Sequence, residues 1–190
     1  GRELGIELVS IDAMQVYKGM DIGTAKPTVA ERAQVVHHLI DLVDADEVFT
    51  VAQFQAEYHR VLESIAQRAG VAVLVGGTGL YLRAIVDDLQ LPGTWPDVRA
   101  RLEDEVARVG PRVLHERLRA VDPQAALKME PTNVRRIVRA LEVCEGSGRR
   151  FSSFGPGVDH YPPSEVRQVA LRWHRDALRR RITRRVEQMV

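Results

Sequence analysis

Asp12 is the side chain whose type and position first suggest a functional site. It directly follows an apolar run, residues 6–11, which is bounded by turn signals and therefore predicts a buried strand. In open α/β sheets, ligands bind beyond the carboxyl ends of the strands, where Asp12 would stand. A carboxylate at that edge can accept hydrogen bonds from a bound molecule. The alternative is a helix cap or a surface turn, both of which favour aspartate.

A second polar turn, around Thr78, follows another apolar run at residues 71–75. Gly76 and Gly77 let the backbone turn sharply and approach a ligand closely, and Thr78 offers a hydroxyl. The turn has no Lys-Ser/Thr pair, so it is not a Walker A motif. A plain strand-to-helix turn would look the same. The turn gains interest because it is expected at the same sheet edge as Asp12.

The elements that must position these residues alternate between strand and helix. Thr50 can cap a helix that has one apolar face and ends at Gly70. The continuous apolar run 71–75 predicts a central parallel strand covered on both faces. This alternation predicts an α/β core with a parallel sheet. Further elements are expected at residues 28–36 (helix), 37–41 (extended), 166–173 (strand) and 176–190 (helix).

From residue 91 the pattern changes to successive helices without an evident strand. A linker rich in turn residues, 91–96, opens this stretch, which we interpret as a helical module over residues 91–150 inserted into the core. Its last helix carries Arg135, Arg136 and Arg139 on the side opposite its apolar face. Such a face can meet a polyanion, although charged helix faces are more often simply solvated.

Composition narrows the class of protein. The 190 residues carry a formal net charge of +1, and no apolar run is long enough to span a membrane. The single cysteine, Cys144, excludes an internal disulfide framework and suits a reducing cytoplasm; it is expected to be a small buried residue.

The segment before Gly5 reads as the end of a helix, and an arginine-rich helix runs into Val190. We therefore expect a fragment.

Five motifs, in order along the chain, carry a family resemblance; they are residues 12–27, 37–41, 76–81, 97–99 and 135–142. With them the chain resembles the tRNA dimethylallyltransferases, the isopentenyl (IPP) transferase family. The resemblance implies a P-loop kinase-like core, here residues 1–90 and 151–190, with an inserted all-helical domain, residues 91–150, that grips the anticodon arm. It also implies a cytoplasmic enzyme, expected to be a monomer.

The family transfers a dimethylallyl group from dimethylallyl diphosphate to N6 of the adenosine next to the anticodon, in tRNAs that read codons beginning with U, with Mg²⁺ assisting. By position, Asp12 matches the family's general base, and Thr78 and Arg99 match positions at the substrate channel. The positions that match tRNA-contacting segments are Asp12, Ala13, Met14, Gln15, Arg135, Arg136, Ile137, Val138 and Arg139. The resemblance identifies no Mg²⁺ ligands.

Three departures from the family pattern bear on function. Ala13 stands where many members carry serine, and Arg135 stands where glutamine also occurs. The glycine-rich phosphate loop that precedes this region in the family is not in the sequence, so no cofactor-binding residue is assigned. Adenylate isopentenyltransferases, small-molecule kinases and a non-catalytic RNA-binding module remain the alternative readings.

The 190-residue chain by itself is expected not to transfer the dimethylallyl group, because the phosphate loop would supply the diphosphate site. A turnover assay with tRNA and labelled dimethylallyl diphosphate checks this. Clear formation of prenylated tRNA would contradict the expectation.

Overall fold

The computed structural model describes residues 5–68, 70–155, 163–164 and 166–189. The chain divides into two compact units, which are treated separately: Gly1–Asp88 with Pro162–Val190, called the core unit, and Leu89–Tyr161, called the helical unit. The second limit lies beyond residue 150, the predicted one. The short 3-10 helix Phe151–Phe154 belongs to the helical unit because Ser152 hydrogen-bonds to Asp122 there.

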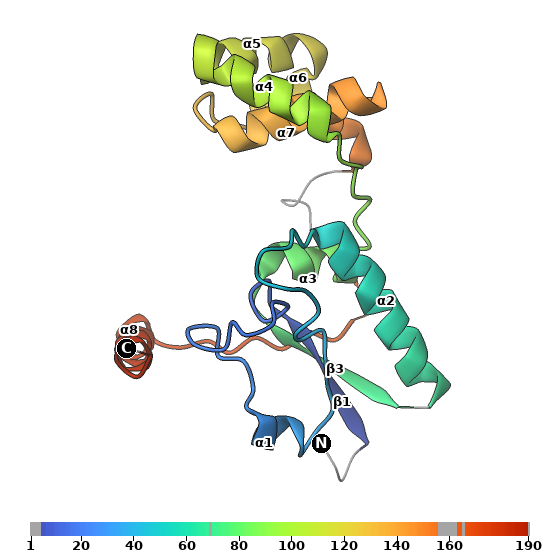
Figure 1. The fold of residues 1–190 in the computed structure, drawn as a ribbon, viewed down its shortest axis with the longest axis vertical. Coiled ribbons are helices and arrows are strands. Elements are labelled where there is room, and N and C mark those ends of the chain that lie inside the picture. Colours follow the sequence, from blue (N-terminus) through green and yellow to red (C-terminus); the bar gives the residue numbers. More distant parts are fainter. Residues whose placement is uncertain (1–4, 69, 156–162, 165, 190) are drawn as a thin grey trace. The chain divides into compact units, whose positions relative to one another are not determined.

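The core unit is built on a parallel sheet with strand order β2-β1-β3. The strands are β1 (Ile6–Ile11), β2 (His37–His38) and β3 (Val71–Gly76), and β1 pairs with both neighbours in parallel. The register joins Ile11 to Gly76, so β1 and β3 end at the same level. The predicted α/β class with a parallel sheet is confirmed (Figure 1).

Helix α2 (Val51–Gln67) covers the sheet and forms the apolar core with α3 (Gly79–Val86). It begins where predicted, because Thr50 and Gln53 form a capping box that satisfies the first backbone N–H groups. Its buried Phe54 stacks on Tyr81 of α3, with ring centroids 4.2 Å apart. This stacking fixes α3, and with it the turn that carries Thr78.

Two predicted features of the strands are wrong. β3 was expected to be covered on both faces, but Val71, Val73 and Val75 are exposed; among the described residues β3 pairs only with β1. Residues 166–173 were expected to form a strand, but they pair with no other strand among the described residues. Val169 and Leu171 there are 87% and 89% exposed, so alternation alone did not bring the segment to a sheet edge.

Two helices of the core unit lie outside its apolar centre. Helix α1 (Val29–Arg32) is a single turn, shorter than the predicted 28–36, and has no buried residue. Helix α8 (Arg175–Glu187) forms as predicted and is also without buried residues. None of the helices in the described part of the chain is both long and apolar enough to cross a membrane.

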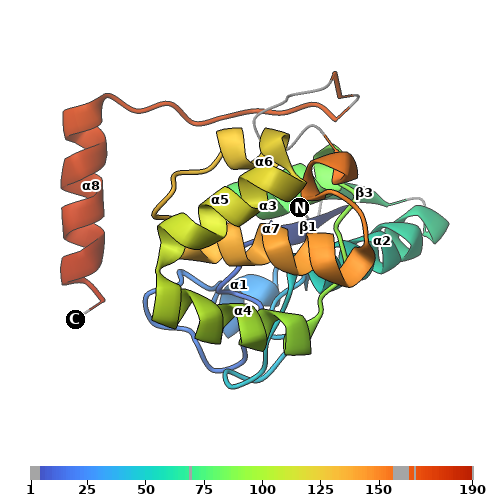
Figure 2. The ribbon, with the colours of Figure 1, turned by 90° about the horizontal axis from the view of Figure 1, so that it is seen from above.

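The predicted succession of helices in the helical unit is confirmed: α4 (Pro96–Val109), α5 (Pro111–Val121), α6 (Pro123–Leu127) and α7 (Val134–Ser147). Proline at the first position favours the start of α4, α5 and α6. Asp122 and Asn133 cap α6 and α7 through their side chains. Figure 2 shows helices α4 to α7 lying against one another. They pack on a core of Leu102, Leu114, Leu118, Ile137, Val138 and Leu141.

Candidate functional site

Asp12 lies one residue beyond the end of β1, as the sequence predicts. Its Oδ1 accepts hydrogen bonds from the backbone N–H groups of Met14 (2.8 Å) and Gln15 (3.3 Å), so the carboxylate organises the turn that follows. Its Oδ2 has no hydrogen bond to any described residue. One oxygen therefore holds the turn, and the other remains available to a bound molecule.

Thr78 lies beside the Asp12 turn and is bonded to it. Its Oγ1 accepts a hydrogen bond from the backbone N–H of Ala13 at 3.0 Å, and its own N–H donates to the carbonyl of Ile11. A Cβ atom at position 76 would lie 2.1 Å from the carbonyl oxygen of Ile11, so only glycine allows this approach. The predicted meeting of the two turns at one sheet edge is confirmed, while the roles of Asp12 and Thr78 stay predictions.

Gln15 braces the loop between residues 12 and 27. Its Oε1 accepts a hydrogen bond from the Ser10 hydroxyl, and its Nε2 donates to the carbonyl oxygens of Thr24 and Ala25. The side-chain amide is thus engaged within the protein, so a tRNA contact made by this side chain would cost one of these bonds. Met14, the neighbouring predicted contact, is 45% exposed.

Lys26, which no sequence pattern singled out, has a side chain that is only 1% exposed. Its Nζ donates to the carbonyl of Tyr17 and pairs with Asp21 (2.8 Å) and Asp41 (2.7 Å), while Arg32 pairs with the other oxygen of Asp41. Burial acts to lower the pKa of Lys26, but the hydrogen bonds that its Nζ donates to the carboxylates of Asp21 and Asp41 outweigh burial and raise the pKa above the ordinary value. Lysine is rarely buried, so only the acidic residues near it in the motifs hinted at this role.

In the helical unit, Arg99 and Arg139 share one buried carboxylate, Glu142. Oε2 accepts from Nε of Arg99 at 3.0 Å, and Oε1 accepts from Nη1 of Arg139 at 2.9 Å. Arg139 also donates to the carbonyl of Pro92. The alternative reading, a simply solvated arginine face, does not hold for Arg139, because this side chain is bound to a buried acid on the same helix; its tRNA contact stays a prediction.

The remaining predicted residues of α7 divide by side-chain burial. Arg135 and Arg136 are exposed and suit contact with a polyanion. Ile137 and Val138 are 0% and 2% exposed and belong to the core of the helical unit. If α7 contacts tRNA, the side chains of these two residues hold the helix in place and do not touch the RNA.

The predicted Mg²⁺ has no protein cage among the described residues, where no group of three or more His, Cys, Asp or Glu side chains is arranged to hold a metal ion. Mg²⁺ is commonly bound by one or two carboxylates together with substrate phosphates. The residues present do not by themselves form such a site, and no step below depends on the ion.

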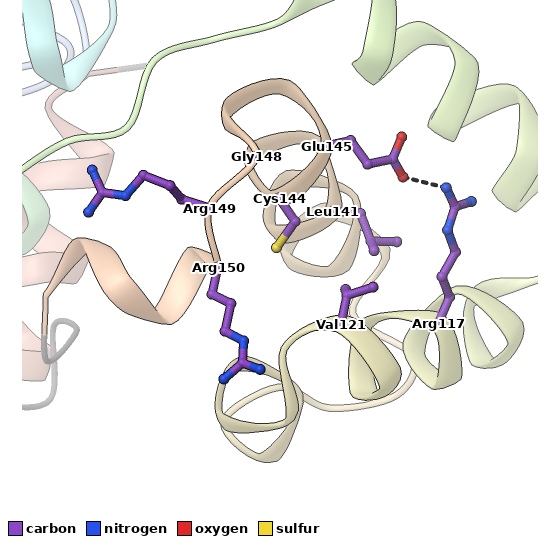
Figure 3. Close-up of a pocket in the computed structure, with 8 residues that line it drawn as sticks. All are labelled: Arg117, Val121, Leu141, Cys144, Glu145, Gly148, Arg149 and Arg150. Carbon is purple, nitrogen blue, oxygen red and sulfur yellow. Dashed lines mark hydrogen bonds and ion pairs between the residues drawn. The ribbon is translucent and has the colours of Figure 1, made fainter.

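The helical unit has a pocket of about 220 Å³, and none of the predicted site residues is among the residues that line it (Figure 3). Leu141 and Cys144 line it, and burial raises the pKa of the Cys144 thiol above its ordinary value, which disfavours the reactive thiolate. Arg117 at its edge is bound to Glu105 and Glu145. The full lining is Arg117, Val121, Leu141, Cys144, Glu145, Gly148, Arg149 and Arg150.

Comparison with known proteins decides the family. The model of the IPP transferase family matches residues 15–190. The chain belongs to the IPP transferase family. A tRNA dimethylallyltransferase from Kineococcus radiotolerans is 52% identical over 183 residues, which are 96% of this chain and 57% of that protein. A tRNA dimethylallyltransferase from Frankia casuarinae is 50% identical over 186 residues, which are 98% of this chain and 62% of that protein. The chain thus spans little more than half the length of these relatives.

Solved structures agree with this assignment and with the predicted fold class. A full-length tRNA isopentenylpyrophosphate transferase from Bacillus halodurans is 40% identical, with a TM-score of 0.59; the match covers 99% of this chain and 58% of that one. A eukaryotic dimethylallyltransferase, captured acting on tRNA, is 25% identical, with a TM-score of 0.72 and coverage of 99% and 47%.

Replacing Lys26 with methionine is expected to lower the free energy of unfolding by about 2–3 kcal/mol, because the carbonyl of Tyr17 and the carboxylates of Asp21 and Asp41 lose the charged donor that they share. Lys18→Met is the matched control, since Lys18 makes an exposed ion pair with Asp44 that is worth less than about 1 kcal/mol. Urea unfolding of both variants measures the difference. Equal losses would show that the Lys26 network does not stabilise the loop.

Proposed function

We propose that the protein transfers a dimethylallyl group from dimethylallyl diphosphate to N6 of the adenosine next to the anticodon, in tRNAs that read codons beginning with U. The observation that carries the proposal is the placement of Asp12 at the carboxyl end of β1, beside the Thr78 turn, in a chain of the IPP transferase family. The names of the relatives, tRNA dimethylallyltransferases, support the same reaction.

Asp12 acts as the general base in the proposed reaction. The exocyclic amine of adenine is neutral and weakly nucleophilic, so it needs a carboxylate within hydrogen-bonding reach. As N6 bonds to the allylic carbon, the carbon–oxygen bond to the diphosphate breaks and the diphosphate leaves with the electron pair. Asp12 accepts the proton that N6 loses. An adenine in a folded anticodon loop must first be flipped out of its stack.

Contacts to the tRNA backbone belong to the exposed arginines of α7. Arg135 and Arg136 have the charge and planar donor fork that suit phosphate. We further propose that Mg²⁺ accompanies the diphosphate as a counter-ion, and that the protein works as a monomer in the cytoplasm, where its single cysteine would stay reduced.

Asp12→Asn tests the base without disturbing the turn, because an asparagine Oδ1 can still accept from the N–H groups of Met14 and Gln15. The assay uses a hybrid in which this chain replaces the matched region of the Kineococcus radiotolerans relative. The expected kcat falls by roughly 10²–10⁴-fold with little change in tRNA affinity.

Asp46→Asn, which changes an exposed carboxylate, serves as the matched control and is expected to keep full activity. If Asp12→Asn lost tRNA affinity but kept its kcat, Asp12 would not be the general base. A hybrid that makes no prenylated tRNA while the intact relative does would contradict the proposed function itself.

The exposed arginines are tested by binding of the chain to an anticodon stem-loop across a range of salt concentrations. Arg135→Gln and Arg136→Gln should each weaken binding and reduce the magnitude of the salt slope by about 1 per lost phosphate contact. Arg119→Gln on α5 removes the same charge from another exposed position and should leave the slope near that of the wild type.

A second stem-loop carries guanosine in place of the adenosine beside the anticodon. Preference for adenosine is the expected result for a site that reads the base. Equal binding would favour a module that attaches to RNA by charge alone.

A further inference from the structure

Glu142 is a buried carboxylate to which sequence analysis assigned no individual role. It lies on α7, is 0% exposed, and accepts three hydrogen bonds. Two come from the guanidinium groups of Arg99 on α4 and Arg139 on α7, and the third comes from the backbone N–H of Trp95 at 2.9 Å. One acid therefore ties together two helices and the linker that precedes α4.

The charge of Glu142 is maintained by these donors. Burial acts to raise its pKa, but the N–H of Trp95 and the guanidinium groups of Arg139 and Arg99 outweigh burial and hold the pKa below its ordinary value. The carboxylate is thus ionised at neutral pH. A buried charge is tolerated when it is paired and fully hydrogen-bonded, as here.

The two arginines that share Glu142 are not equally engaged. Arg139, whose side chain is 25% exposed, donates hydrogen bonds from Nη1 to Glu142 and from Nη2 to the carbonyl of Pro92. Arg99 is 40% exposed and donates only through Nε; its terminal Nη atoms make no hydrogen bond to any described residue, and Glu103 lies 3.8 Å from Nη1. Its terminal nitrogens are thus held at the surface by a bond at the other end of the guanidinium.

Glu142 is one carboxylate between two guanidinium groups, and Nη1 of Arg99 also forms a long, exposed ion pair with Glu103 at 3.8 Å. A phosphate-binding arginine requires fixed geometry, because the planar fork binds an oxyanion only when it is correctly oriented. The three bonds of Glu142 supply the orientation. The exposed side of Arg99 supplies the contact.

We propose that Glu142 is a positioning residue, which holds the guanidinium of Arg99 in the orientation that contacts a phosphate of the bound tRNA. The inference rests on the proposed function, because it takes tRNA as the ligand. Glu142 itself touches no RNA; without it, two adjacent guanidinium groups lack their shared counter-ion and separate.

Whether RNA binding strengthens or weakens when Glu142 loses its charge distinguishes a positioning role from simple electrostatics. Removing a negative charge near a phosphate-binding surface should, by charge alone, strengthen RNA binding. Loss of positioning predicts the opposite. Glu142→Gln is therefore expected to weaken binding of an anticodon stem-loop about tenfold, as for the loss of one charge-assisted contact.

Asp122→Asn is the matched control. Asp122 is also a fully buried carboxylate of the helical unit, and its donors are the N–H of Ala125 and the N–H and hydroxyl of Ser152, none of which is a predicted tRNA contact. This variant removes the same charge from an equally buried site of the same unit. Its affinity for the stem-loop should equal or slightly exceed that of the wild type.

Thermal unfolding is recorded for both variants, and binding is compared at a temperature at which each is folded. Arg99→Lys provides a second variant should Glu142→Gln not fold: it keeps the charge but lacks the planar fork, and is expected to weaken binding similarly. Wild-type affinity in Arg99→Lys, or affinity in Glu142→Gln equal to or tighter than that of Asp122→Asn, would overturn the proposal.

The outcome also separates this proposal from the proposed function. A wild-type chain that does not bind the stem-loop contradicts both. A wild-type chain that binds, with Glu142→Gln as strong as the control, contradicts only the role of Glu142. An independent readout is the NMR signal of the Arg99 Nε–H, which should be protected from exchange in the wild type and lose that protection in Glu142→Gln.

Discussion

The core unit depends on the contact between the backbones of Ile11 and Gly76. These two residues are paired at the ends of β1 and β3, and the absence of a side chain at Gly76 lets the strands stay side by side to their last residue. The turns that follow are then forced together, which places the Thr78 hydroxyl on the N–H of Ala13. Any methyl group at position 76 would push the two turns apart and separate Asp12 from its neighbour.

Both units hold their polar segments with buried ions. In the core unit a lysine lies between two aspartates, and in the helical unit a glutamate lies between two arginines. Taking such ions out of water is costly, and an apolar substitute can be as stable. Their value here is directional, because the bonds set where a loop or a guanidinium group lies. The central ion is a cation in the core unit and an anion in the helical unit, but both networks fix the position of a polar segment.

Features with local causes could be predicted from the sequence. The capping pair Thr50 and Gln53, the prolines that begin α4 to α6, and the caps Asp122 and Asn133 all act within a few residues. The meeting of Asp12 with Thr78 also followed from a rule of parallel sheets. These features define the helices, the strand ends and the edge at which the candidate site lies.

Features that depend on distant partners could not be predicted in this way. The exposure of alternate valines in β3 depends on what packs against that face of the sheet, and residues 166–173 alternate without a partner strand in the described chain. The burial of Lys26 depends on Asp41, fifteen residues away, and the engagement of Arg99 depends on Glu142, at a separation of 43 residues. Charge patterns indicate that such residues exist but not which of them meet.

The placement of Trp95 makes the Glu142 cluster visible to spectroscopy. Its indole lies directly against Gly146 of α7, and the backbone N–H of the same residue donates to the buried carboxylate of Glu142. The chain has one other tryptophan, Trp173, which is half-exposed and covered by the guanidinium of Arg181. With Trp173 replaced by phenylalanine, the intrinsic fluorescence of the chain would come from a single indole seated beside the acid that joins α4 to α7. The emission of Trp95 would then report on the packing of α4 against α7 without any added label.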